Sequence, residues 1–370
     1  MRVRGKQANK QAMKQGSELA GLESQPIETS DEASLVSKGC FSTSVRPVRI
    51  AGLGAYVPEK VLTNADLEQM VDTTDEWIVT RTGIRERRIA AENEAASDLS
   101  LAAARRALEK AGVSPSSLDM IIVATVTGDM PFPATASIVQ HALGAERAGA
   151  FDLSAGCTGF IYALAVGSSM VGVGVCDTVL VVGVDVLSKI TNWKDRSTCV
   201  LFGDGAGAAV LKPGSEHSRF LAFDLGSDGG GADLLKIPAG GSRKPITVEA
   251  VQAGEQYIQM CGSEVFKFAV RIIVQATQSV LAKCGLKTTD IDAFVAHQAN
   301  IRIIESAVAR LGLPPEKVVV NVDRYGNTSS ASIPIALEEA EREGKIRPGD
   351  LVVVVGFGAG LSWGAAALYW

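Results

Sequence analysis

The chain has 370 residues, of which 46% are hydrophobic and 21% charged, and its formal net charge is −5. This length suits one large α/β domain or two ordinary ones with a sizeable core. A nucleic-acid-binding protein usually carries a basic surplus, which is absent here, and no apolar run approaches the ~20 residues of a membrane span. We therefore expect a soluble protein that contacts no nucleic acid and no membrane.

Residues 1–46 differ in composition from the rest of the chain. They are rich in Lys, Gln, Ser and Glu and poor in aromatic residues. A plastid or mitochondrial transit peptide is basic at its start, as this segment is, but poor in acidic residues, which this segment is not. We interpret residues 1–46 as a disordered extension and keep the transit peptide as the alternative.

From residue 47 onward, strand and helix patterns alternate. Apolar runs predict strands at 48–58, 119–127 and 178–186, and an amphipathic pattern predicts a helix over 97–112. Ser97 is expected to cap the start of that helix, and Gly112 to lie just past its end. Continuous Val and Ile runs separated by helices predict a parallel sheet covered on both faces.

The chain also contains an internal duplication. "ALEKAGVSPSSLDMIIVAT" (107–125) aligns without a gap on "VLAKCGLKTTDIDAFVAHQ" (280–298), at an offset of 173 residues. The same offset places "DTVLVVG" (177–183) on "DLVVVVG" (350–356). We predict two similar halves, 47–212 and 213–370, related by a pseudo-twofold axis, with a ligand site where their strand ends meet.

Three polar groups fall at equivalent strand or helix ends of the two halves. Cys157 begins the helix "CTGFIYAL", whose counterpart in the second half follows Asn327 in "GNTSSASIPIAL". His297 follows the apolar strand "DAFVA" and aligns with Ala124, at the end of an equivalent strand. The duplication therefore predicts that Cys157, His297 and Asn327 converge.

Each of these groups also has a purely structural interpretation. A lone Cys is usually a small buried hydrophobe, but the start of a helix stabilises the reactive thiolate. The other cysteines lack that setting and are taken as structural; they are Cys40, Cys176, Cys199, Cys261 and Cys284. None of the six forms a CxxC pair, so no zinc site is expected, and scattered single thiols favour a reducing compartment such as the cytoplasm.

Two reactions suit Cys, His and Asn together. A papain-like protease uses His to deprotonate Cys and Asn to orient the ring, but the papain signature around the Cys is absent. In thioester chemistry, Cys157 instead takes an acyl group, and neutral His297 and Asn327 donate hydrogen bonds to a developing enolate. The doubled α/β body favours the second.

The chain closely resembles the β-ketoacyl-acyl carrier protein synthase III family, the initiating condensing enzymes of type II fatty-acid synthesis. The resemblance covers residues 47–370 and implies a thiolase-like α/β fold in five layers, α-β-α-β-α. It is carried by "NADLEQMVDTTDEWIVTRTGIRERRIA", "AFDLSAGCTGFIYAL", "DRSTCVLFGDGAGAAVL", "GSEVFKFAV", "HQANIRII" and "GNTSSASIPIAL".

The resemblance implies a reaction in two stages. Cys157 is acylated from a short acyl-CoA, most simply acetyl-CoA, with its own N–H and that of Ala359 holding the oxyanion. Malonyl-ACP then binds, and His297 and Asn327 stabilise the carbanion that its decarboxylation forms. This carbanion attacks the acyl-Cys to give a 3-oxoacyl-ACP. No cofactor is implied, since loss of CO2 generates the nucleophile.

The resemblance also implies the binding residues. CoA is expected to contact Trp77, Arg81, Arg196 and Asn300, with the adenine stacked between Trp77 and Arg196. The acyl carrier protein is expected on the segment 298–302 and on a basic patch. In full, this set is Gln298, Ala299, Asn300, Ile301, Arg302, Lys267 and Arg310. Phe132 is expected to close the acyl pocket of the partner in a homodimer.

The sequence departs from the family pattern at two positions. Ala359 stands where some members have Gly, and a side chain there would strain a left-handed backbone. Ser263 replaces an Asn, a change expected to alter hydrogen bonding in the substrate tunnel. A related acyltransferase or condensing enzyme with another starter or acceptor is one alternative. A non-catalytic thiolase-fold subunit is the other, and it conflicts with the retention of Cys157, His297 and Asn327.

Overall fold

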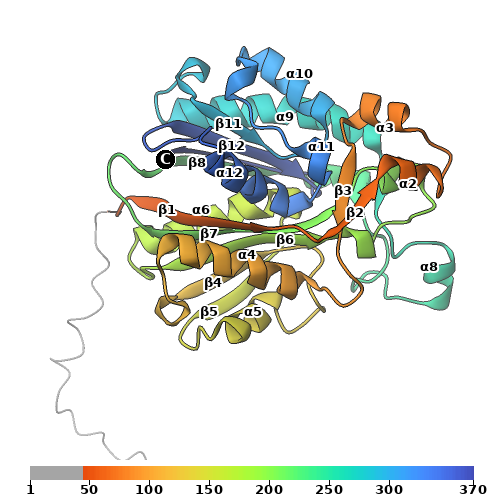
Figure 1. Ribbon diagram of the computed structural model, residues 1–370, viewed down its shortest axis with the longest axis horizontal. Coiled ribbons are helices and arrows are strands. Elements are labelled where there is room, and N and C mark those ends of the chain that lie inside the picture. Colours follow the sequence, from red (N-terminus) through yellow and green to blue (C-terminus); the bar gives the residue numbers. More distant parts are fainter. Residues whose placement is uncertain (1–44) are drawn as a thin grey trace, which may run out of the picture. The chain divides into compact units, whose positions relative to one another are not determined.

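The computed structural model describes residues 45–370 (Figure 1). The predicted extension 1–46 lies outside the described residues except for its last two positions. Arg46 is hydrogen-bonded to the body of the protein: its guanidinium donates to the Val171 carbonyl at 2.6 Å and to Asp177 at 2.7 Å.

Five strands make the first sheet, in the order β1-β7-β6-β4-β5. All residues of β6 are buried, as expected for an unbroken apolar run between two layers. β4 runs parallel to β5 and β6, whereas β7 is antiparallel to both β6 and β1. The strands are β1 (Val48–Tyr56), β4 (Met120–Ala124), β5 (Gly149–Leu153), β6 (Val179–Val186) and β7 (Asp204–Pro213).

Four strands make the second sheet, in the order β11-β12-β13-β8. β11 and β12 are parallel, and the other two pairs are antiparallel. The strands are β8 (Arg219–Ser227), β11 (Ala293–Ala296), β12 (Leu351–Gly358) and β13 (Ser362–Tyr369).

The prediction of a parallel sheet is therefore correct only for β4, β5 and β6 and for β11 and β12, because both sheets also contain antiparallel pairs. Only residues 359–361 join β12 to β13, and so short a connection can link only antiparallel neighbours. No helix crosses the sheet between β6 and β7 either. The long connection 187–203 instead runs past the carboxyl end of β6 and supplies residues around Cys157.

The helices complete five layers, which confirms the thiolase-like architecture (Figure 1). α4 (Ala96–Ala111) and α5 (Thr135–Leu143) cover the outer face of the first sheet. α6 (Gly159–Gly172) and α12 (Ser332–Arg342) lie between the two sheets, and α9 (Gly262–Lys283) and α10 (Ile301–Leu311) lie on the outer side of the second.

Helix α4 shows where the sequence-based capping prediction was wrong. Gly112 ends the helix in the left-handed conformation, as expected. The helix begins earlier than predicted, however, so Ala95 takes the N-cap position and Ser97 lies inside the first turn. There the Ser97 hydroxyl donates to Asp129 at 2.6 Å, which ties α4 to the loop after β4.

The same hydrogen bonds recur in both halves at the offset of 173 residues. Asp119 accepts a hydrogen bond from the backbone N–H of Thr178 at 2.9 Å. Asp292 accepts the equivalent bond from the N–H of Leu351, also at 2.9 Å. The 3-10 turn Gly156–Thr158 before α6 likewise corresponds to the 3-10 turn Ser329–Ala331 before α12, and these two turns pack together. The turns therefore bring the helix starts of the two halves face to face.

Helix α9 is long and apolar enough to span a membrane by length and composition, with a mean hydropathy of 1.3. Its buried side chains, among them Phe268, Ile273 and Val280, pack on the second sheet and on α10. The described structure therefore accounts for its apolar face as part of the protein core.

Shorter elements occupy the connections around the site. β2 pairs with β3 and β9 with β10, each pair antiparallel. Their bounds, with those of the short helices, are β2 (Lys60–Thr63), β3 (Glu86–Ile89), β9 (Leu235–Lys236), β10 (Gln259–Met260), α2 (Asn64–Glu68), α3 (Asp75–Thr82), α7 (Arg196–Cys199), α8 (Val248–Gln252) and α11 (Val322–Tyr325).

Candidate active site

Two cavities meet at Cys157. The first, of about 230 Å³, is almost entirely apolar and is lined by Cys157, Leu187, Ile190, Phe202, Ile258 and Ser329 among others. The second, of about 160 Å³, is lined by Cys157 together with His297, Asn300 and Asn327. The structure thus brings Cys157, His297 and Asn327 to one cavity, although they come from different halves of the chain.

His297 lies directly after β11 with 1% of its surface exposed. Its Nδ1 atom lies 2.6 Å from the Ser332 hydroxyl, and that hydroxyl already accepts the backbone N–H of Gln298 at 3.3 Å. The Ser332 hydroxyl has no acceptor other than Nδ1 among the described residues, so we assign it as the donor to Nδ1, which leaves the proton of a neutral ring on Nε2. The edge of the ring faces Phe357, with 5.3 Å between the centroids.

Burial strongly lowers the pKa of His297, to about 3. No carboxylate among the described residues opposes this shift, since its only hydrogen-bond partner on the ring is a hydroxyl. His297 is therefore a neutral hydrogen-bond donor at physiological pH and not an imidazolium.

Asn327 is held by the backbone on both sides. Its N–H donates to the Leu201 carbonyl at 2.9 Å, and its own carbonyl accepts the N–H of Gly203 at 3.0 Å. Its side-chain oxygen accepts the N–H of Ser329 at 2.9 Å. Because the oxygen is occupied, the amide nitrogen is the part of the side chain that can donate to a ligand in the cavity.

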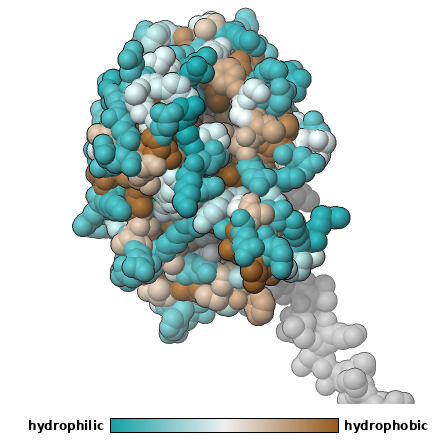
Figure 2. All heavy atoms as spheres, turned by 90° about the vertical axis from the view of Figure 1, so that its right-hand side faces the viewer, coloured by the Kyte–Doolittle hydropathy of each residue, from teal (hydrophilic) through white to brown (hydrophobic). Residues whose placement is uncertain are grey.

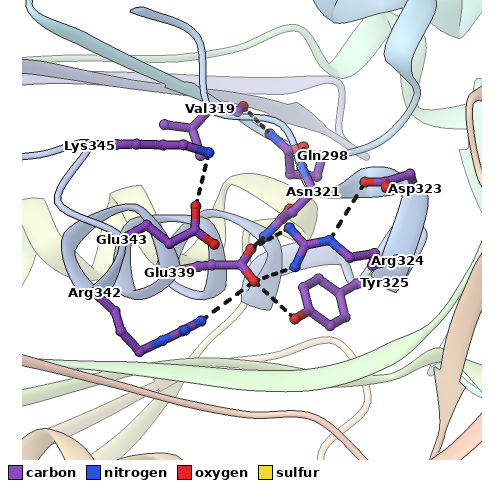
Figure 3. Close-up of polar contacts among 10 residues, drawn as sticks. All are labelled: Gln298, Val319, Asn321, Asp323, Arg324, Tyr325, Glu339, Arg342, Glu343 and Lys345. Carbon is purple, nitrogen blue, oxygen red and sulfur yellow. Dashed lines mark hydrogen bonds and ion pairs between the residues drawn. The ribbon is translucent and has the colours of Figure 1, made fainter. Parts of the chain in front are cut away.

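A buried polar network anchors the segment that leads to Asn327 (Figure 3). Glu339 of α12 accepts hydrogen bonds from Asn321 at 2.9 Å, from both terminal nitrogens of Arg324 at 2.6 and 2.9 Å, and from the Tyr325 hydroxyl at 3.2 Å. Burial alone would raise the pKa of Glu339, but the hydrogen bonds from Arg324 and Asn321 leave it lowered. The charged carboxylate thus fixes α11 on α12, immediately before Gly326 and Asn327.

Cys157 lies in the turn that starts helix α6, as predicted from the sequence. Burial raises the pKa of its thiol to about 12, a hydrogen bond from the Ser329 hydroxyl opposes the rise, and the charge of Asp185 adds to it. The helix start alone therefore does not give Cys157 the low pKa that the sequence-based argument expected.

The backbone of residues 358–359 lies against the turn that carries Cys157. A Cβ atom on Gly358 would come within 2.6 Å of the Cys157 nitrogen, and one on Gly156 within 3.0 Å of the Ala359 nitrogen. The expected strain at Ala359 does not occur, because Ala359 does not have a positive φ: Ser329 is the one non-glycine residue in the described range that does. In this loop the positive φ, 142°, falls on Gly360 instead. The backbone segments that carry the N–H groups of Cys157 and Ala359 thus pack directly against each other.

The predicted CoA residues cluster at α3. The Arg196 guanidinium lies 4.9 Å and that of Arg81 5.7 Å from the centre of the Trp77 ring. Asn300 starts α10, where its side chain accepts the N–H of Arg302 and donates to the Arg81 carbonyl at 3.0 Å. Figure 2 shows the side of the molecule on which α2, α3 and α8 lie, with hydrophobic groups scattered among hydrophilic ones.

Two residues predicted to contact a carrier protein cannot do so from their positions. Gln298 is 1% exposed, and its side chain donates to the carbonyls of Ala296 and Val319 and accepts the N–H of Asn321. Ala299 is buried and lines the second cavity. We therefore correct these two assignments: Gln298 is a structural link between the His297 strand and the Glu339 network, and Ala299 faces the cavity.

The other predicted carrier residues lie nearer the surface. Arg302 and Lys267 are exposed, and the Arg302 guanidinium lies 5.6 Å from the centre of the Phe266 ring of α9. Lys267 pairs with Glu264 at 2.8 Å. Ile301 is half-buried, and exposed Arg310 lies in the last turn of α10, two turns beyond Arg302. The three exposed basic groups therefore lie on α9 and α10, two helices that pack against each other.

Phe132 is the most exposed large apolar side chain of the described chain, with 84% of its surface accessible. It lies in the loop after β4 together with Val126 and Met130, which are also exposed. It does not line either cavity of its own chain. Ser263 is exposed and lines neither cavity, so the expected effect on tunnel hydrogen bonding has no support here.

Sequence reasoning missed three groups next to the site. Ser329 contacts Cys157, Ser332 sets the tautomer of His297, and Asp185 is fully buried beneath the turn of residues 329–330. The offset of 173 contains a signal for Ser329, because it aligns this residue with Gly156 of the first half.

Comparisons with known proteins agree with these features. Residues 151–229 match the family described as 3-oxoacyl-[acyl-carrier-protein (ACP)] synthase III, and residues 281–370 match its C-terminal family. A β-ketoacyl-[acyl-carrier-protein] synthase III of Symbiobacterium thermophilum is 63% identical over 326 residues, which cover 88% of this chain and 99% of the relative. One from Desulfitobacterium hafniense is 56% identical over 323 residues, covering 87% and 98%.

Solved structures with this fold include close relatives. The 3-oxoacyl-[acyl-carrier-protein] synthase III of Aquifex aeolicus is 47% identical, with a TM-score of 0.82 over 87% of this chain and 100% of that one. The Thermus thermophilus enzyme is 52% identical, with a TM-score of 0.81 over 87% and 99%. A priming β-ketosynthase of a polyketide pathway is 40% identical, with a TM-score of 0.82 over 88% and 97%.

Proposed function

The chain belongs to the β-ketoacyl-acyl carrier protein synthase III family, the condensing acyltransferases that initiate type II fatty-acid synthesis, and we propose that Cys157, His297 and Asn327 carry out its reaction. The observation that carries this proposal is their meeting at one cavity, with a second, apolar cavity on the other side of Cys157. The first half, 47–212, supplies the nucleophile, and the second, 213–370, supplies the two donors.

In the first stage, the sulfur of Cys157 attacks the carbonyl carbon of an acyl-CoA. The bond between that carbon and Cys157 forms, and the bond to the CoA sulfur breaks, with the proton leaving on CoA. The adjacent N–H groups of Cys157 and Ala359 receive the oxyanion of the tetrahedral intermediate. The acyl chain then occupies the apolar cavity of about 230 Å³.

In the second stage, malonyl-ACP enters the cavity that His297 and Asn327 line. Loss of CO2 leaves an enolate, whose oxygen receives the Nε2–H of His297 and the amide N–H of Asn327. Its carbon attacks the acyl carbonyl, the new C–C bond forms, and the bond to Cys157 breaks. The departing CO2 leaves its electron pair behind as the nucleophile, so the reaction needs no metal or redox cofactor.

The low pKa of His297 gives a prediction about pH. We expect the rate of CO2 release from malonyl-ACP to show no inflection near pH 6.5, because the ring stays neutral down to about pH 3. Radiometric CO2 release between pH 5.5 and 8 measures this, with His141→Gln, which removes an exposed imidazole, as the control. The neutral-donor role would be contradicted if the wild-type rate fell at low pH with an apparent pKa near 6.5 and the His297→Ala variant showed no such fall.

The same shift has a defined sign for stability. The unfolded chain takes up a proton on this histidine near pH 6.5, whereas the folded chain does not do so until about pH 3. The free energy of unfolding therefore falls as the pH drops below about 6.5, by at most about 1.4 kcal/mol per pH unit from this group.

Substrate contacts are proposed from the resemblance and the surface. Trp77 and Arg196 lie one over the other at 4.9 Å, and an adenine would enter by separating them and stacking on the indole. Arg302, Lys267 and Arg310 offer basic charge on a chain whose net charge is −5, which suits an acidic acyl carrier protein. Exposed Phe132 supports a homodimer in which it closes the partner's apolar cavity.

The starter group decides between two versions of the function. Acetyl-CoA is the first candidate. The apolar cavity of about 230 Å³ in one chain has more room than a two-carbon group needs, but a Phe132 side chain contributed by a second copy would take up part of it. A priming ketosynthase of polyketide synthesis has the same fold. A longer or branched starter, or a different acceptor, is therefore the second candidate.

Mass spectrometry of the intact chain after incubation with a panel of acyl-CoAs tests the proposal. We expect one acyl adduct, confined to the Cys157 peptide, which malonyl-ACP then removes as a 3-oxoacyl-ACP. An adduct only from branched or longer acyl-CoAs would select the second candidate. An unmodified Cys157 with every acyl-CoA would reject the proposed function.

The cellular compartment is proposed from the relatives, which are bacterial enzymes. We propose the cytoplasm. A plastid location would depend on residues 1–46 acting as a transit peptide, and the comparisons give this alternative no support.

A further inference from the structure

Cys157 must form a thiolate in surroundings that disfavour negative charge. The titratable groups that face it are Asp185, whose charge raises the thiol pKa, and neutral His297. Lys236 also lines the first cavity, but its ammonium is paired with Asp233 at 2.5 Å. Unlike a papain-type site, therefore, the described part of the chain offers the sulfur no imidazolium or free ammonium as a partner.

One side-chain hydrogen bond does reach the sulfur. The Ser329 hydroxyl lies 3.3 Å from Sγ of Cys157 in donor geometry. Ser329 is 2% exposed and lines the first cavity beside Cys157. A hydroxyl donor buried against a thiolate gives a charge-assisted hydrogen bond, which is stronger than one between neutral groups.

The backbone of Ser329 shows that this side chain is held in place against a local conformational preference. Its φ is 50°, the left-handed region in which side chains are disfavoured. The equivalent residue of the first half, 173 positions earlier, is Gly156, which has φ 55°. The duplicated turn therefore needs a left-handed residue in both halves: the first uses glycine, and the second carries a serine there despite the strain.

Neighbouring hydrogen bonds maintain that conformation. The buried carboxylate of Asp185 accepts the N–H of Ser330 at 3.2 Å and its hydroxyl at 2.9 Å. The N–H of Ser329 donates to Asn327 at 2.9 Å. These contacts hold the turn, so the Ser329 hydroxyl stays within reach of the sulfur, although the Asp185 carboxylate, whose pKa burial raises and a hydrogen bond from Ser329 lowers, is a second acceptor for it.

We propose that Ser329 is a further catalytic residue, whose hydroxyl donates a hydrogen bond to the Cys157 thiolate and thereby speeds its acylation. The inference rests on the proposed function, since it concerns the first stage of that reaction. The S–H bond of Cys157 breaks, its sulfur bonds to the acyl carbon, the bond between that carbon and the CoA sulfur breaks, and the proton leaves on the sulfur of CoA. The backbone N–H of Ser329 continues to position Asn327 for the second stage.

Two substitutions separate the hydroxyl from the strain. Ser329→Gly removes the hydroxyl and places in the second half the residue that the first half already has. Ser329→Ala removes the hydroxyl but keeps a Cβ atom in the left-handed region. We expect the glycine variant to have a melting temperature at or above that of wild type, and the alanine variant one no higher than that of wild type. Both variants should be slow in the acylation of Cys157.

Two rates measured on the full chain test the role. The alkylation profile of Cys157 with iodoacetamide between pH 7 and 9.5, followed on its peptide by mass spectrometry, should lie about tenfold lower in rate in both variants, because a smaller fraction of the thiol is ionised at each pH. Single-turnover acylation by acetyl-CoA at pH 7 should slow about 10- to 100-fold, the usual effect of losing a hydrogen bond to a charged group. CO2 release from malonyl-ACP should stay within about twofold of wild type, since the backbone N–H to Asn327 remains.

Ser168→Ala is the matched control. Ser168 is a buried serine of α6 whose hydroxyl has no partner among the described residues and which lines neither cavity. Its variant should alkylate and acylate at the wild-type rate. An unchanged alkylation profile in Ser329→Gly would overturn the inference whatever acyl-CoA the enzyme uses. Failure of wild type to accept any acyl group would instead reject the proposed function, because alkylation needs no acyl-CoA.

Discussion

Replacing Cys157 by alanine is expected to abolish acylation and condensation, with rates at least about 1000-fold below wild type. Cys157 is the one thiol that lines either cavity in residues 45–370, so no neighbouring sulfur can take its place. The adjacent N–H groups of residues 157 and 359 remain, but they have no covalent intermediate to stabilise. Formation of 3-oxoacyl-ACP from acyl-CoA and malonyl-ACP, followed by mass spectrometry, measures the loss.

The same variant should still decarboxylate malonyl-ACP, because His297 and Asn327 are unchanged. Cys284→Ala serves as the matched control, since Cys284 follows the end of α9, lines neither cavity, and donates a hydrogen bond from its thiol to the Val280 carbonyl. The control should keep wild-type condensation. Substantial condensation by Cys157→Ala would show that another group is the nucleophile.

Replacing Asn327 by alanine should have the complementary effect. We expect normal acylation of Cys157 from acyl-CoA but a loss of malonyl-ACP decarboxylation of about 100- to 1000-fold, the effect of removing one oxyanion donor. The reason is geometric: the side-chain oxygen of Asn327 is occupied by the N–H of Ser329, so the amide nitrogen is what faces the enolate.

Rapid-quench acylation and CO2 release measure the two stages separately. Asn327→Asp is the companion variant: it keeps the acceptor for Ser329 and the shape of the side chain, but it loses the donor and should also fail to decarboxylate. A variant that decarboxylates normally but cannot be acylated would reverse the proposed roles of the two halves. Equal losses in both stages would instead indicate a collapsed turn, which melting temperature would reveal.

The roles of Cys157 and Asn327 differ although their surroundings are related by the duplication. Cys157 lies in the turn Gly156–Thr158 before α6, and Asn327 precedes the equivalent turn before α12. In the first half the turn carries the nucleophile, and in the second it carries Ser329 and positions Asn327. One ancestral backbone motif thus supports two different chemical tasks.

Much of this arrangement was predictable from local sequence patterns and from the repeat. The apolar runs at 119–127 and 178–186 are β4 and β6, and Gly112 ends α4 as its position indicated. The constant offset of 173 predicted two halves with equivalent elements, and the bonds of Asp119 and Asp292 to equivalent N–H groups agree with it.

Other predictions failed because they depended on packing or on the route of a connection. Continuous apolar strands are compatible with parallel or antiparallel neighbours once both faces are covered, so strand composition could not predict the mixed sheets. Gln298 looked like a surface residue next to Asn300, yet its side chain turns inward to bond Ala296, Val319 and Asn321. A linear motif does not contain the direction of a side chain.

The sequence by itself predicted two equivalent halves and the convergence of Cys157, His297 and Asn327, because a constant offset between related segments is a property of the chain alone, and the resemblance to the family implied the thiolase-like fold. Only the tertiary structure decided that His297 is neutral and that Ser329 donates to Cys157. Both depend on what surrounds a group in space: burial sets the pKa of His297, and the Ser329–Cys157 contact joins residues 172 positions apart, across the packed turns of the two halves.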